Sequence, residues 1–124
     1  MQINKPEIVE EVTHAFMRYE RALTSNDVEV LDELFWNSEH TVRFGATEHL
    51  YGFAEIQAFR AGRPSQGLDR DMLKTQITTF GDDLATAHLE FQRIGSDKVG
   101  RQTQTWVRLP QGWRVVSAHV SMLA

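Results

Sequence analysis

The sequence predicts an α+β fold in which a long, curved antiparallel sheet packs on three N-terminal helices. Apolar residues recur at spacings of three and four in three segments before residue 62, which is the period of a helix that buries one face. From Arg70 onward, apolar and polar residues alternate in runs separated by short turns that contain glycine. These runs are about 9–11 residues long, and long strands twist strongly, so a sheet that curves over the helices is the economical architecture.

The N-terminal segment is predicted to form two helices with a tight stop between them. Pro6 suits a first turn, and the first helix extends to about Ser25. Ser25-Asn26-Asp27 then ends it and caps a second helix, from Val28 to about Leu34. The apolar stripe of the first helix consists of Ile8, Val12, Ala15, Phe16, Tyr19 and Leu23.

A short hairpin and a third helix come next. Thr41–Phe44 and Glu48–Tyr51 each alternate and each end at a glycine, so the two are predicted to pair. Helical spacing returns from Phe53 to about Ala61, and Gly62 and Pro64 end that helix.

The last part of the chain is predicted to form a four-stranded antiparallel meander. Its turns contain glycine, which suits the tight reversals between neighbouring strands. The expected strands are Met72–Phe80, Leu84–Ile94, Arg101–Leu109 and Trp113–Met122. Together with the helices they make residues 1–124 one expected domain, since a single core commonly serves about 100–200 residues.

The charge pattern argues against a nucleic-acid partner. The chain has 17 acidic and 13 basic residues and a net charge of −4. Ten of the 13 basic residues are arginine, spread along the chain rather than gathered in a patch. Arginine differs from lysine because its planar guanidinium clamps carboxylates with two hydrogen bonds, so the question is whether any arginine faces inward.

Several kinds of catalytic site are absent from the sequence. There is no cysteine, so there is no disulfide, thiolate nucleophile or Cys-ligated metal. The five histidines show no metal-ligand spacing, and we expect no metal and no other cofactor. No nucleophile elbow of the G-x-S-x-G kind and no glycine-rich phosphate loop occurs.

Tyr19 and Arg43 are the candidate catalytic residues. Tyr19 lies on the buried stripe of the first helix yet carries a hydroxyl that needs a partner; the alternative is an ordinary core tyrosine. Arg43 and Thr41 take one face of their strand and Val42 and Phe44 the other, so Arg43 is either solvated or directed inward. Beside Tyr19, Arg43 would favour the phenolate and could hold a substrate carboxylate.

Three further residues are candidate substrate-binding residues: Trp36, Arg63 and His119. Arg63 follows Arg60 at a helix C-terminus, where both could simply compensate the helix dipole or could form a second carboxylate clamp. Alternation places His119 on one face of the last strand with Trp113 and Val115. There it lines a cavity floor, or serves as a structural or interface histidine.

Several strings resemble one family along essentially the whole chain. They are Leu34-Phe35-Trp36, Thr41-Val42-Arg43-Phe44-Gly45, Leu50-Tyr51-Gly52, Phe59-Arg60-Ala61-Gly62-Arg63-Pro64, Gly100-Arg101-Gln102-Thr103-Gln104-Thr105-Trp106 and Ala118-His119-Val120-Ser121. The chain resembles the AtzH/HpxZ-like group of the nuclear-transport-factor-two-like (SnoaL-like) superfamily, whose fold is a cone-like curved sheet on helices. The resemblance implies a cytoplasmic protein of s-triazine or purine nitrogen catabolism. Its AtzH branch resembles a decarboxylating amidohydrolase that acts on a dicarboxylated urea, and the key tyrosine and arginine of that branch fall on Tyr19 and Arg43.

The leading hypothesis is therefore a metal-free hydrolase for a small anionic, urea-like substrate. One alternative is a non-catalytic binding or assembly subunit that accompanies an amidase. Another is an isomerase or dehydratase of the ketosteroid-isomerase kind, for which Glu90 is the nearest candidate base. The first residues contain no apolar signal segment, so we expect a cytoplasmic protein without a membrane partner. We also expect a homodimer, because open sheets commonly pack face to face.

Overall fold

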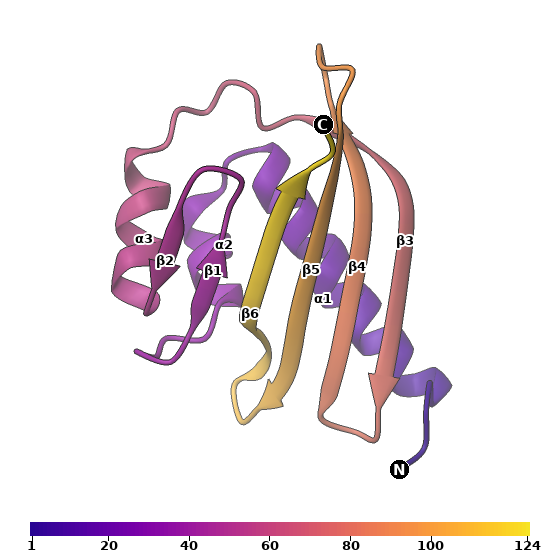
Figure 1. Ribbon diagram of the computed structural model, residues 1–124. Coiled ribbons are helices and arrows are strands. Elements are labelled where there is room, and N and C mark those ends of the chain that lie inside the picture. Colours follow the sequence, from indigo (N-terminus) through magenta and orange to yellow (C-terminus); the bar gives the residue numbers. More distant parts are fainter.

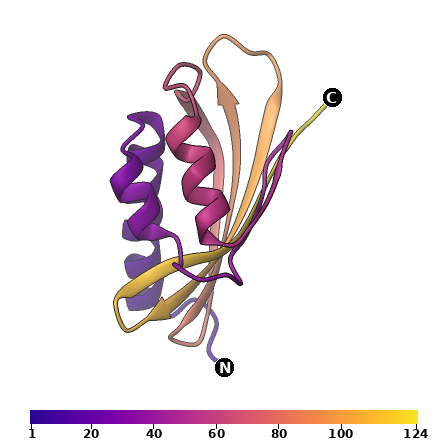
Figure 2. The ribbon, with the colours of Figure 1, turned by 90° about the vertical axis from the view of Figure 1, so that its left-hand side faces the viewer.

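Three helices cover one face of a six-stranded sheet in the computed structural model, which describes residues 1–124 (Figure 1). Figure 2 shows the helices on one side of the sheet, whose long strands bend around them. The elements are α1 (Pro6–Thr24), α2 (Val28–Leu34), β1 (Val42–Phe44), β2 (His49–Tyr51), α3 (Phe53–Gly62), β3 (Arg70–Phe80), β4 (Leu84–Arg93), β5 (Val99–Leu109) and β6 (Gly112–Met122). The predicted α+β fold is confirmed, and β3 and β5 each begin two residues earlier than expected.

The strand order β2-β1-β6-β5-β4-β3 joins the hairpin to the meander. All neighbours are antiparallel except β1 and β6, which pair in parallel with Arg43 opposite Ala118. Alternation within each strand does not predict this pairing, because it links segments far apart in the chain. Its consequence is that Arg43, Ala118 and Gln104 lie side by side in one row across three strands.

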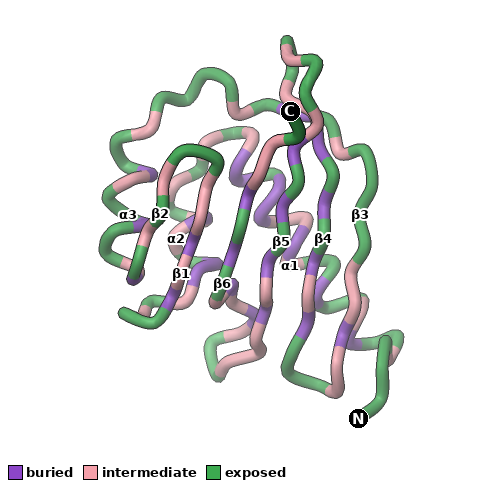
Figure 3. The backbone as a smooth tube through the Cα atoms, viewed as in Figure 1, coloured by how far each residue is buried: buried purple, intermediate pink, exposed green.

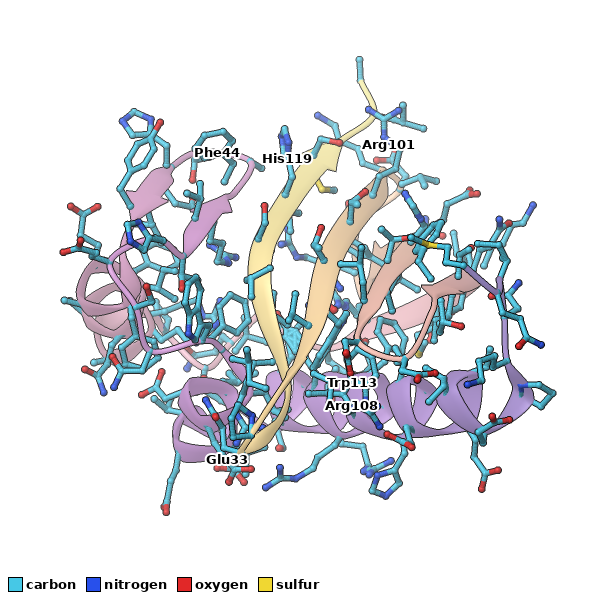
Figure 4. The ribbon with its side chains drawn as sticks, turned by 90° about the horizontal axis from the view of Figure 1, so that it is seen from below. Glu33, Phe44, Arg101, Arg108, Trp113 and His119 are labelled. Atoms are coloured by element: carbon cyan, nitrogen blue, oxygen red, sulfur yellow. The ribbon has the colours of Figure 1, made fainter.

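A bulge in β6 overturns the predicted placement of His119. Trp106 is opposite Val115 and Thr105 is opposite Ser117, so β6 has one extra residue at this point. The extra residue reverses which side chains face the helices. Trp113 and Val115 are buried on the helix side, whereas Ser117 and His119 are exposed on the other side. Figure 4 shows His119, Phe44 and Arg101 on the side of the sheet away from α1.

The hydrophobic core lies between the helices and the inner face of the sheet, which is the face toward α1. Buried and exposed residues alternate along β4, β5 and β6, as Figure 3 shows. The largest fully buried side chains include Trp106, Phe16, Phe35 and Phe91. The predicted stripe of α1 is confirmed, with Ala15 only partly buried. No helix is long and apolar enough to span a bilayer.

We predict that Gly100→Ala destabilises the fold by about 1–3 kcal/mol, which is typical of overpacking in a core. A Cβ at Gly100 would lie 2.2 Å from Cζ of Phe91. That ring is fully buried, and the Arg70 guanidinium lies 4.2 Å from its centroid, so it has little room to move. Urea unfolding gives the free energy. Gly62→Ala is the control, because a Cβ there meets nothing within 4 Å; equal losses in the two variants would contradict the prediction.

Candidate functional site

Tyr19 lies in the interior on α1 and is only 4% exposed. Helical spacing directs it toward the sheet together with Phe16 and Leu23. Its ring centre is 6.0 Å from that of Phe35, the residue that follows α2. Phe35 is therefore the aromatic residue that packs beside Tyr19.

Arg43 faces inward from β1 and is 9% exposed, which decides between the solvated and inward directions that alternation left open. Its Nη1 donates to Oε1 of Glu48 at 2.9 Å, and its guanidinium lies 5.5 Å from the centre of the Phe59 ring. Burial raises the pKa of the Glu48 carboxyl, but hydrogen bonds from Thr47 and Arg43 outweigh it and hold this pKa below its usual value. Arg43 is thus a fixed, partly neutralised cation in the interior.

The end of α3 sends two more arginines inward. Nη1 of Arg60 donates to the Leu31 carbonyl and to Oδ1 of Asp32, both at 3.3 Å, and its guanidinium lies 4.1 Å from the centre of the Phe35 ring. Nη2 of Arg60 is buried and has no partner. Nε and Nη2 of Arg63 are also buried and have no partner. The inward direction and the free N–H groups of Arg60 and Arg63 favour a carboxylate clamp over the alternative role of compensating the helix dipole.

Electrostatics link these arginines to Tyr19. Burial lowers the pKa of the Arg60 and Arg63 guanidinium groups. Tyr19 acts on both in the opposite direction, and the charge of Arg43 lowers both pKa values further. The contacts agree with this: Tyr19 and Arg60 both lie against the Phe35 ring. Arg43 and Arg63 both lie against the Phe59 ring, at 5.5 and 5.9 Å from its centre.

A second polar group lies one residue further along α1, at Glu20. The Glu20 carboxylate accepts from Nε of Arg70 at 2.9 Å and from Nη2 at 2.7 Å, and both side chains are almost completely buried. Nη2 of Arg70 also donates to Oε1 of Gln102 at 3.0 Å. Arg93 lies beside this group, because its guanidinium is 5.6 Å from the centre of the Phe91 ring that Arg70 also contacts. Burial lowers the pKa of Arg93, and the charge of Arg70 acts in the same direction.

Gln104 completes the polar lining on β5. It is fully buried, and its Oε1 accepts from Nε1 of Trp106 at 3.1 Å. Its Nε2 has no partner, and neither has Nε2 of Gln102. Both glutamines face the helices, a direction that alternation on β5 leaves open because polar residues occupy both faces of that strand.

The interior has a surplus of positive charge. We call Arg43, Arg60, Arg63, Arg70 and Arg93 the inner arginine cluster. Three carboxylates pair with it, and they belong to Glu48, Asp32 and Glu20. Buried charges are stable only when they are paired, so two guanidinium groups without a carboxylate favour the binding of an anion.

Two of the three candidate substrate-binding residues, Trp36 and His119, do not pack against Tyr19. The Trp36 ring lies 6.1 Å from that of His40, and the place beside Tyr19 belongs to Phe35. The His119 ring lies 5.6 Å from that of Phe44 on the outer face. Arg60, which sequence analysis considered with Arg63 as part of a clamp, is only 2% exposed. Gln102 and Gln104 are the polar residues that sequence reasoning did not assign to the site, because alternation on β5 gave no signal for their direction.

Two hollows of the molecule lie away from Tyr19 and the inner arginine cluster. One of about 880 Å³ is on the outer face and is lined by residues that include His88, Glu90, Arg101 and His119. Another of about 1300 Å³ runs along α1 beside Trp113. Glu90, the candidate base for an isomerase, is therefore exposed on the face opposite Tyr19. No three His, Cys, Asp or Glu side chains gather in a way that could hold a metal ion.

Comparisons with known proteins agree with this architecture. A model of the AtzH-like family matches residues 1–124. A protein of unknown function from Pectobacterium atrosepticum is 60% identical, with a TM-score of 0.97 over 98% of this chain and 95% of that chain. A cystatin-like fold protein from Burkholderia xenovorans is 44% identical, with a TM-score of 0.96 over 100% of this chain and 98% of that chain.

A protein of the nuclear-transport-factor-two-like superfamily from Salmonella enterica shares the fold at 23% identity. Its TM-score is 0.76 over 95% of this chain and 92% of that chain. No protein with a curated description matches the chain. The cone-like fold and the family that the motifs indicated are confirmed.

We predict that Glu48→Gln weakens the acid sensitivity of folding. Because the folded-state pKa of Glu48 lies below its unfolded value of about 4.5, its ionised form contributes stability that is complete above that value. This contribution is lost as the pH falls through the folded-state pKa. The free energy of unfolding of the wild type should therefore fall more steeply than that of Glu48→Gln as the pH is lowered from about 5 to 3.

Urea unfolding at a series of pH values measures this difference. Glu10→Gln is the control, because Glu10 is exposed and has no ion-pair partner. Parallel curves for the wild type and Glu48→Gln would contradict the prediction.

Proposed function

Because the chain belongs to the AtzH-like family, we propose that it is a metal-free hydrolase for a small carboxylated urea or ureido acid. The observation that carries this proposal is the surplus of buried guanidinium groups around Tyr19. Guanidinium groups bind carboxylates through paired N–H donors, and a phenol can donate a further hydrogen bond, so the donor set suits a carboxylate substrate. The substrate class comes from the family resemblance, and the charge of the inner arginine cluster supports it.

Arg43 and Arg63 each bind one carboxylate of the substrate in this proposal. Arg43 uses Nη1 on Glu48, and its other N–H groups hold one substrate carboxylate. Arg63 has no carboxylate partner of its own and takes the second carboxylate through Nε and Nη2. A dianion would therefore bind better than a monoanion of the same size.

Tyr19 handles the proton in this proposal. When an N-carboxyl group leaves as CO₂, its C–N electron pair stays on nitrogen, which must take up a proton. When water cleaves an amide C–N bond, the hydroxyl joins the carbon and the departing nitrogen also takes a proton. Tyr19 supplies that proton as a general acid, and the adjacent arginines stabilise the phenolate that remains.

The isomerase alternative lacks a suitable base. Glu90 is exposed on the outer face, and the buried Glu20 accepts two hydrogen bonds from Arg70, which hold it as an ion-pair partner. Both oxygens of the Glu20 carboxylate are thus occupied by Arg70 and not free to meet a substrate proton. The assembly-subunit alternative predicts no turnover, and the first experiment below separates it from the enzyme.

We predict release of ammonia and CO₂ when the wild type is mixed with carboxylated ureas and biurets. Tyr19→Phe should lower kcat by about 10²–10⁴-fold, the usual contribution of a general acid. Arg43→Ala should raise KM as well, because it removes a carboxylate ligand. The variant is also made together with Glu48→Gln, which avoids leaving a buried carboxylate unpaired.

Arg21→Ala is the matched control, because Arg21 is exposed and forms no ion pair. It should keep wild-type turnover. Equal turnover in the wild type, Tyr19→Phe and Arg43→Ala would contradict the assigned roles. No turnover in the wild type with any of these compounds would contradict the enzyme proposal and favour a binding or assembly subunit.

We also propose a homodimer that forms through the outer face of the sheet. Phe44, Tyr51 and His119 pack edge to edge there, and Tyr51 is 56% exposed. An exposed aromatic group of this kind is typical of interfaces. A second copy would cover this group and the polar hollow beside it.

We predict that light scattering gives twice the chain mass of 14.2 kDa. Tyr51→Asp should shift the equilibrium to the monomer, because it would bury a charge in the interface. Ile94→Asp replaces another exposed apolar residue, at the end of β4, and serves as the control. A monomeric wild type at all concentrations would contradict the proposal.

A further inference from the structure

We propose that Gln104 recognises the carbonyl oxygen of the bound substrate and stabilises the negative charge that develops on it. The proposal rests on the proposed function for the identity of the substrate, and on the structure for the donor. Gln104 is fully buried, and its Nε2 has no hydrogen-bond partner. Native proteins rarely leave a buried N–H donor unpaired, so this nitrogen is available to an acceptor such as a ligand oxygen.

The orientation of the Gln104 amide is fixed by chemistry. The indole Nε1–H of Trp106 can only donate, so the atom of Gln104 that lies 3.1 Å from it must be the oxygen. The amide nitrogen therefore points away from Trp106 with both of its hydrogens available. Gln104 therefore has two N–H donors free for a ligand, while its oxygen is already engaged by Trp106.

Gln102 is oriented by the same logic. Arg70 can only donate, and its Nη2 lies 3.0 Å from Oε1 of Gln102. Arg70 is itself held by two hydrogen bonds to Glu20, so the amide cannot turn over without breaking this network. The Gln102 nitrogen is consequently a second fixed donor.

The unpartnered atoms of the arginines and of the two glutamines all have one character. They are Nη2 of Arg60, Nε and Nη2 of Arg63, and Nε2 of Gln102 and Gln104, and every one is an N–H donor. The inner face has one further unpartnered atom, the hydroxyl oxygen of Thr79, which lies on β3, three strands away from β6. The matching ligand presents acceptors throughout, such as two carboxylates and a carbonyl between them. A dicarboxylated urea has this pattern, whereas a plain dicarboxylate lacks the central acceptor.

The sheet places Gln104 and Arg43 within reach of one small molecule. Both pair with Ala118 of β6, from opposite sides, so the three residues form one row on the inner face. Strands lie about 4.8 Å apart, which separates the Cα atoms of Arg43 and Gln104 by about 10 Å. The single methyl group of Ala118 stands between them. A ligand carboxylate on Arg43 can therefore lie next to a carbonyl on Gln104.

A donor at this position also serves the reaction. The carbonyl oxygen becomes negatively charged when water attacks the amide, and a preorganised N–H that meets it there lowers the barrier. Because Trp106 holds the amide before substrate arrives, no reorientation is needed during the reaction. Trp106 is in this respect a positioning residue.

The test compares the binding of two acids that differ only in the central carbonyl. 3-Oxoglutarate has the five-atom chain, the two carboxylates and the carbonyl of a dicarboxylated urea but no C–N bond, and glutarate lacks the carbonyl. Isothermal titration calorimetry in the cold, with freshly dissolved 3-oxoglutarate, gives both Kd values. The wild type should bind 3-oxoglutarate about tenfold more tightly, the usual effect of one hydrogen bond.

Two variants remove the donor in different ways. Gln104→Leu replaces the amide by an apolar group, and Gln104→Glu keeps an acceptor for Trp106 but offers no N–H. Both should lose the preference for 3-oxoglutarate, and Trp106→Phe should reduce it by freeing the amide. Gln76→Leu on the outer hollow is the control and should keep the preference, because Gln76 is exposed on the other face.

The outcomes separate this inference from the proposed function. A wild type that binds neither acid, or binds both equally, overturns the role of Gln104. So does a preference that survives in Gln104→Leu and Gln104→Glu, or one that is lost in Gln76→Leu. If the preference depends on Gln104 but no carboxylated urea is turned over, carbonyl recognition stands and the proposed hydrolase fails.

Discussion

Buried ion pairs between arginines and carboxylates organise this small protein, and everything at the candidate site depends on them. Glu20 with Arg70 ties α1 to β3, Asp32 with Arg60 ties α2 to α3, and Glu48 with Arg43 closes the β1–β2 hairpin. Removing one partner of such a pair leaves a buried charge and typically costs about 3–5 kcal/mol. The pairs therefore fix the relative positions of the helices and the sheet edge.

Two members of the inner arginine cluster have no carboxylate partner. Arg63 and Arg93 lie among them without a carboxylate, and burial lowers the pKa of both because it penalises the charged form. A bound anion would offset that penalty, so the surplus of positive charge favours an anionic ligand. Structural charges and ligand-binding charges thus belong to one network.

The two faces of the sheet carry different side chains because of one bulge in β6 and the parallel pairing of β1 with β6. Pairing of β1 with β6 brings Arg43 into the row of Ala118 and Gln104 on the inner face. The bulge in β6 turns His119 to the outer face, beside the aromatic group of the hairpin. The inner face is left with guanidinium, phenol and amide groups, and the outer face with histidines and exposed rings.

The sequence predicts what depends on local periodicity and misses what depends on long-range registry. The helices, the strands and the inward direction of Tyr19 follow from spacing, and all agree with the structure. For Arg43, alternation showed only that it shares a face with Thr41, and the structure shows that this face is the inner one. His119 was misplaced because an inserted residue is invisible in an alternating pattern.

The inward direction of Gln104 could not be predicted, since polar residues occupy both faces of β5. Phe35 and Trp36 are neighbours of similar character, so only the three-dimensional contacts show which one meets Tyr19.

A crystal structure of the protein grown with glutarate tests the central claim most directly. The account predicts one carboxylate on Nε and Nη2 of Arg63 and the other beside Arg43, with Tyr19 next to the bound chain. Glutarate found only in the outer hollow, or water on the Arg63 nitrogens at saturating glutarate, would contradict the account.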